Sequence, residues 1–152
     1  MKRLISEVLK RPDGSLQSVL YCVGDEGRPD QAIANTLLEF LELSYPSAAE
    51  IERLVALAET GSYTPKNPAW ADWGVNEVDL WLLPPMAEPG HICISNENTG
   101  EYSTEEGGQP QQFTYEQFRA ALKHWREFRE LIAREGKDKL VGRRYEAVFP
   151  EA

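Results

Sequence analysis

Histidine and cysteine are the residue types in this chain best suited to nucleophilic chemistry, and it has two of each. His91 and Cys93 stand two positions apart in an apolar segment, and the alternation of a strand would place both side chains on one face. Such a pair could supply a thiolate and a base to a small hydrolase. No third orienting residue or oxyanion loop accompanies it, so we predict no catalytic residues and keep a Cys/His-dependent hydrolase as an alternative.

The remaining residues of these types receive structural predictions. Cys22 and Cys93 both lie in apolar alternating runs, which favours buried reduced thiols over a disulfide. His124 stands beside Trp125 on the polar side of a predicted helical stripe, and we expect it in solvent. The segment from Ser95 has the glycine and final glutamate spacing of an EF-hand loop, but two acidic ligand positions are missing. We therefore predict no metal and no cofactor.

Acidic side chains carry the strongest signal in the sequence. The chain has a formal net charge of −9, with −11 through Tyr115 and +2 from Glu116 onward. The 35 residues of the acidic window, Asp72–Glu106, contain eight Asp and Glu and no Lys or Arg, with Trp and Tyr between them. Carboxylates can steer a basic partner while aromatic rings supply contact area. The alternative is a solubilising surface whose tryptophans belong to the core.

We interpret the window as a face that binds a basic protein. The predicted partner-binding residues are Asp72, Trp73, Glu77, Asp79, Glu97, Glu101, Tyr102, Glu105 and Glu106. The acidity argues against a nucleic-acid partner, which requires a basic footprint. No apolar run approaches the roughly 20 residues that cross a bilayer, so we expect no membrane partner. Charges at Glu7, Lys10 and Arg11 interrupt any signal-peptide core, and we expect a cytoplasmic protein.

Length and periodicity predict one α+β domain over residues 1–152. The turn sequence Arg11–Ser15 separates two apolar runs, which predicts a β-hairpin of Leu4–Leu9 and Leu16–Val23. Helical patterns over 30–44 and from Ser47 to Gly61 predict an αα-hairpin. We expect a loop over Ser62–Gly74 that lies over the sheet. Predicted strands follow over Val75–Leu83 and His91–Ser95, with an edge strand over Tyr145–Phe149. With the hairpin they make an antiparallel sheet of four to six strands.

The last helix has the clearest sequence signals. Thr114 and Gln117 have the spacing of a capping box, with Phe113 and Phe118 placed as a hydrophobic staple. The predicted apolar stripe consists of Phe118, Leu122, Trp125 and Ile132, thickened by Ala121 and Phe128. Gly136 is expected to end the helix, which should pack on one face of the sheet.

Three segments together resemble the C-terminal half of small bacterial immunity proteins from polymorphic-toxin and contact-dependent growth inhibition systems. They are Gly90–Glu101, Phe113–Phe118 and Leu122–Phe128, about a third of the chain. The resemblance implies an acidic, cytoplasmic, non-enzymatic antitoxin that blocks the active site of a cognate toxin domain, often a basic nuclease. Such proteins share no fixed binding residues, so none is assigned here by position.

The leading hypothesis is therefore an immunity protein that neutralises a basic, nuclease-like toxin domain by occluding its active site. An intracellular adaptor that binds a cellular protein or peptide is the second hypothesis. The Cys93/His91 hydrolase is the third. The sequence leaves the partner's identity, the strand order and the oligomeric state open.

Overall fold

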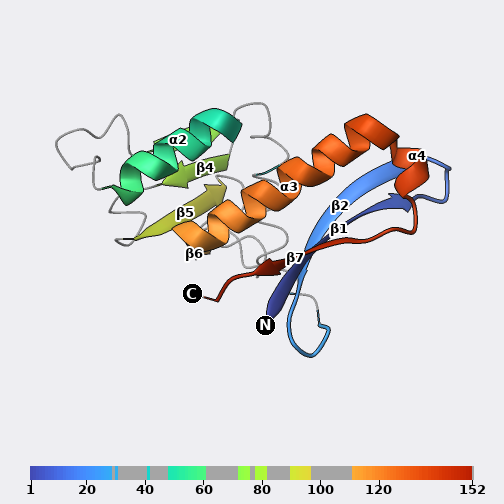
Figure 1. The fold of residues 1–152 in the computed structure, drawn as a ribbon, viewed down its shortest axis with the longest axis horizontal. Coiled ribbons are helices and arrows are strands. Elements are labelled where there is room, and N and C mark those ends of the chain that lie inside the picture. Colours follow the sequence, from blue (N-terminus) through green and yellow to red (C-terminus); the bar gives the residue numbers. More distant parts are fainter. Residues whose placement is uncertain are drawn as a thin grey trace.

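A computed structural model places most of the predicted elements, and it describes residues 1–28, 30, 41, 48–60, 72–75, 78–81, 90–96 and 111–151 (Figure 1). The strands are β1 Lys2–Lys10, β2 Leu16–Val23, β3 Asp72–Val75, β4 Val78–Trp81, β5 His91–Asn96, β6 Gln111–Thr114 and β7 Tyr145–Phe149. The helices are α2 Ala48–Glu59, α3 Tyr115–Glu135 and α4 Lys137–Leu140. The predicted α+β class is confirmed.

The strands form two antiparallel sheets where the sequence predicted one sheet of four to six strands. One sheet has three strands in the order β2-β1-β7, and the other has four in the order β3-β4-β5-β6. β7 pairs with β1 at the edge of the three-stranded sheet, as predicted for Tyr145–Phe149. The 21-residue α3 is about 30 Å long and contacts both sheets.

The N-terminal hairpin matches its prediction because its turn is specified locally. The amide of Gly14 donates to the carbonyl of Arg11 at 2.9 Å, and Gly14 has a φ of 88° that favours glycine. The carboxylate of Asp13 accepts from the Ser15 amide at 2.9 Å and from its hydroxyl at 2.6 Å. These contacts fix the full-length pairing of β1 with β2.

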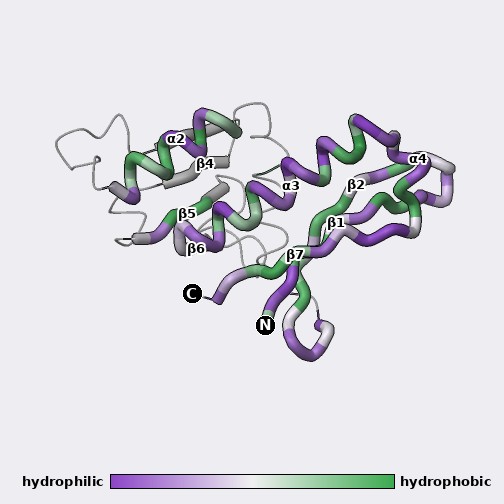
Figure 2. The backbone as a smooth tube through the Cα atoms, in the orientation of Figure 1, coloured by the Kyte–Doolittle hydropathy of each residue, from purple (hydrophilic) through white to green (hydrophobic). Residues whose placement is uncertain are grey.

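The capping box and the end of α3 are also confirmed. Thr114 Oγ1 accepts from the Gln117 amide at 3.1 Å, and Gln117 Oε1 accepts from the Thr114 amide at 3.0 Å. At the other end the Gly136 amide donates to the carbonyl of Ile132 at 2.8 Å. Hydrophobic and hydrophilic positions alternate along the helix (Figure 2), and its buried residues are Phe118, Ala121, Leu122, His124, Trp125 and Phe128.

Two boundaries differ from the sequence predictions, and one strand was not predicted. Asp72–Val75 is a strand, although residues through Gly74 were expected in a loop, and the predicted strand over Val75–Leu83 is described only as Val78–Trp81. Val75 belongs to β3 and pairs with Val78 of β4, so the predicted single strand includes residues of two strands. β6 was missed because Phe113 is its one apolar residue; its pairing with β5 defines it. Most of the predicted helix over 30–44, and with it the αα-hairpin, lies outside the described residues.

The core is one cluster of buried side chains that joins both sheets to the helices. Leu4 and Val8 from β1 meet Trp125 and Phe128 from α3, while Ile92 from β5 packs in the same cluster. Side chains from α2 and α4 also belong to it. A single buried cluster of this kind fixes the two sheets relative to the helix that crosses them.

Candidate functional site

The four-stranded sheet has one face packed against the helices. Ile92, Ile94 and Phe113 are at most 2% exposed and belong to the cluster shared with α2 and α3. Because successive residues of a strand point to opposite faces, the cross-strand register assigns every other strand position to a face. Leu80 pairs with Ile94, and Trp73 pairs with Leu80, so position 73 belongs to the helix-packed face.

The opposite face carries two acidic positions of the predicted window. Asp72 pairs with Trp81, and Asp79 pairs with Gly74, so positions 72, 79 and 81 share this face. Residues diagonal across neighbouring strands lie about 7–8 Å apart, which is the relation between Asp72 and Asp79. The four strands contain no Lys or Arg. On the same face Gln112 is exposed, whereas Cys93, which pairs with Trp81 and Gln112, is 2% exposed.

The register therefore separates the predicted site residues that lie on strands. Positions 72 and 79 share the face opposite the helices, whereas position 73 belongs to the helix-packed face. Position 81 shares the face of the two acids by register, and it pairs with the buried Cys93. The other predicted partner-binding residues lie outside the described residues: Glu77, Glu97, Glu101, Tyr102, Glu105 and Glu106.

Many of the chain's cations pair with carboxylates outside the acidic window. Arg126 Nη1 lies 2.7 Å from Glu52 Oε1, and Arg119 pairs with Glu59, so two α3 arginines face acids of α2. The further described pairs of this kind are Lys2–Asp30, Arg3–Glu146, Arg28–Glu26, Arg143–Glu135 and Arg144–Glu7. These seven pairs engage nearly half of the chain's 16 Lys and Arg side chains.

The Cys93 and His91 positions do not favour a reactive thiolate. Cys93 is 2% exposed, and burial raises the pKa of its thiol. Cys22 is fully buried, and burial raises its thiol pKa to about 11. Both cysteines are free, as the sequence predicted. Because a thiol must deprotonate to attack, this environment suits a packing role.

A buried serine–histidine pair is the polar arrangement that the sequence reading missed. His124, expected in solvent, is 1% exposed, and its Nε2 lies 2.8 Å from Oγ of the fully buried Ser6. The His124 ring stacks on Tyr145 at a centroid distance of 5.2 Å, and the Tyr145 hydroxyl donates to Glu127. His124 Nδ1 has no hydrogen-bond partner among the described residues. The polar side of the helical stripe thus packs against β1 and β7.

The same burial decides the charge state of the imidazole. Desolvation lowers the pKa of His124 to about 4, with a smaller opposing effect from Glu127. The ring is therefore neutral near pH 7 and weakly basic. Since Ser6 is also inaccessible to a substrate, the pair resembles a nucleophile and base in composition but serves to join β1 to α3.

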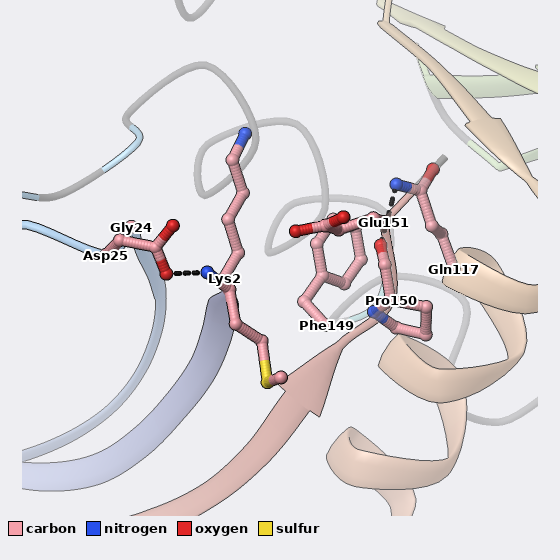
Figure 3. A pocket seen from close by; sticks show the side chains of 8 residues that line it. Lys2, Gly24, Asp25, Gln117, Phe149, Pro150 and Glu151 are labelled. Atoms are coloured by element: carbon pink, nitrogen blue, oxygen red, sulfur yellow. Dashed lines mark hydrogen bonds and ion pairs between the residues drawn. The ribbon is translucent and has the colours of Figure 1, made fainter.

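A pocket of about 360 Å³ lies where β1 begins and β7 ends (Figure 3). Phe149 and Pro150 supply apolar surface, and charges of both signs line it, including Lys2, Asp25 and Glu151. Lys2 Nζ donates to Asp30 at 2.9 Å, so its charge is already partnered. The pocket brings together no nucleophile and base.

The described residues contain no group of His, Cys, Asp or Glu able to hold a metal ion. Within the same part of the chain, no helix is both long and apolar enough to cross a membrane. Comparisons with protein-family models, curated proteins and solved structures gave no match. The chemistry of the chain's own surface is therefore the basis for a functional proposal.

Proposed function

We propose that this protein is a non-enzymatic immunity protein that binds a basic, nuclease-like toxin domain and occludes its active site. The observation that carries the proposal is the register of β3 and β4, which brings Asp72 and Asp79 to the sheet face opposite the helices. These strands lie in a window without Lys or Arg. Seven cations elsewhere pair with carboxylates outside that window.

The mechanism is electrostatic and steric. Carboxylates of the window would occupy the positions that nucleic-acid phosphates take in a basic cleft, and the sheet would block entry of the substrate. Charge complementarity of this type chiefly accelerates association, and its reach shortens to about 8 Å at physiological salt. The association rate should therefore fall steeply with added salt, and a rate that is flat in salt would contradict this mechanism.

The direct test is co-expression with the product of the gene immediately upstream. The expected result is rescue of cells from that product by the wild-type chain and loss of rescue with Asp72→Lys/Asp79→Lys. Glu130→Lys is the control for a single charge reversal outside the window, because Glu130 is exposed on α3. A harmless neighbour, or toxicity that the wild-type chain leaves unchanged, would remove the support for this proposal.

A further inference from the structure

A second charged surface lies at the end of the molecule where the β1–β2 turn meets α4 (Figure 1). We define the basic tip as residues 9–13 and 137–144. It contains six Lys and Arg against two Asp, in a chain whose net charge is −9. The two segments are far apart in sequence and are joined by an isolated parallel bridge between Val8 and Val141. Tertiary structure therefore gathers these cations.

The tip concentrates cations without an ion pair, although Lys123 and Arg134 on α3 also lack one among the described residues. Lys10, Arg11, Lys137 and Lys139 form no ion pair with a described carboxylate, in contrast to Arg119 and Arg126 on α3. Asp13, one of the two acids of the tip, is occupied by hydrogen bonds from Ser15. The tip therefore keeps a net positive charge.

Two more cations of the tip have only long ion pairs. Arg143 lies 3.7 Å from Glu135, and Arg144 lies 3.7 Å from Glu7. Both arginine side chains remain more than 60% exposed. Exposed pairs of this geometry contribute little and leave the guanidinium groups able to bind another anion.

Apolar side chains lie among these charges. Leu9 is 45% exposed and Val141 is 40% exposed, and the Val8–Val141 bridge brings their two segments together. Both belong to the few large apolar side chains that the described part of the chain leaves exposed. Exposed apolar side chains among charged ones are typical of a protein-binding surface.

We infer that the basic tip binds an acidic segment of a protein partner, at a surface separate from the one proposed for the toxin. Charge complementarity selects an anionic occupant. The two exposed apolar side chains and the net charge of −9 select a discrete acidic protein segment over an extended polyanion, which would also meet the acidic body of the chain. The partner would present carboxylates around small apolar side chains.

A labelled peptide of alternating Glu and Val tests this inference with the intact protein. We expect fluorescence anisotropy to show binding that weakens with salt and is absent for the matched peptide with Lys in place of Glu. Lys10→Glu/Arg11→Glu should weaken binding about tenfold or more, since it reverses two charges at the contact. Leu9→Ser/Val141→Ser should weaken it severalfold at unchanged charge.

Lys123→Glu is the control for a charge reversal outside the tip, because Lys123 is exposed on α3 some 20 Å along the helix from α4. It should leave peptide binding unchanged. Equal binding of both peptides, or binding that the tip variants do not alter, would overturn the inference. Tip-dependent binding that is tighter to single-stranded DNA or to phosphatidylserine vesicles than to the acidic peptide would also overturn it. So would tip-dependent self-association in ultracentrifugation without binding to the peptide.

Discussion

Ser6 Oγ and His124 Nε2 lie 2.8 Å apart in the interior, although 118 positions separate the two residues in sequence. This contact joins the middle of β1 to the middle of α3. His124 is the one polar residue among the buried positions of α3, and the bond to Ser6 gives its Nε2 a partner there. A buried polar pair of this kind is stabilising only while both partners are present.

Removing Ser6 alone should therefore destabilise the protein more than removing the pair. We expect Ser6→Ala to lower the free energy of unfolding by about 1–3 kcal/mol, because it leaves a buried imidazole nitrogen without a partner. Ser6→Ala combined with His124→Leu should recover part of this loss. Urea denaturation of both single variants and the double variant gives the coupling energy, and strictly additive losses would contradict a direct bond.

The lowered pKa of His124 predicts acid sensitivity with a defined sign. The unfolded imidazole binds a proton below its ordinary pKa of 6.5, whereas the buried ring resists protonation until about 4. The unfolded state therefore binds more protons between pH 4 and 6.5, and the free energy of unfolding falls as pH decreases through this range. The loss from this group is at most roughly 3 kcal/mol.

The measurement is urea denaturation at pH 7.5 and at pH 5 for the wild type and for His124→Gln. We expect the wild type to lose more stability between the two conditions than the variant, because glutamine does not titrate. Equal losses in the two proteins would show that other groups set the acid response.

Gly136 should be the least replaceable glycine at the end of α3. It has φ 87° and ψ 148°, and an added Cβ would lie 2.8 Å from Asp138 Oδ1. We expect Gly136→Ala to cost about 1–3 kcal/mol in thermal or urea unfolding. Gly142→Ala is the comparison, since its φ is 83° but nothing lies within 4 Å of the added carbon. It should cost less, and Asp138→Ala should relieve part of the Gly136→Ala effect.

The capping box predicts a smaller, local effect at the start of α3. Thr114→Ala removes the acceptor of the Gln117 amide and should lower the free energy of unfolding by about 1 kcal/mol. Thr114→Ser keeps a hydroxyl acceptor and should retain most of the stability. Gln117 also donates from Nε2 to the Pro150 carbonyl at 2.9 Å, so Gln117→Ala should additionally loosen the end of β7. Amide hydrogen exchange in Tyr145–Phe149 should then rise in Gln117→Ala and not in Thr114→Ser.

The buried cysteines give a reactivity test of the hydrolase hypothesis. With thiol pKa values raised by burial, Cys22 and Cys93 should react slowly with a disulfide reagent at pH 7.5 and rapidly once urea unfolds the chain. Cys22→Ala isolates Cys93 for this assay. A native Cys93 that reacts faster than a free model thiol would restore the catalytic alternative.

The elements predicted most closely from sequence are those whose specification is local. The β1–β2 turn depends on Asp13 and Gly14, and the start of α3 depends on Thr114 and Gln117. Each structure is held by hydrogen bonds between residues a few positions apart. The residue types at those positions therefore suffice to predict it.

Tertiary structure decided the features that depend on distant partners. β6 is a strand because its residues pair with β5, and His124 is buried because β1 and β7 pack against the polar side of its helix. Register, rather than residue type, separated Trp73 from Asp72 and Asp79. The sequence by itself determined the α+β class, the hairpin, the capped helix and the cation-free window. The packing of both sheets against α3 decided which side chains of these elements meet, because strand pairing and burial depend on the partner surface.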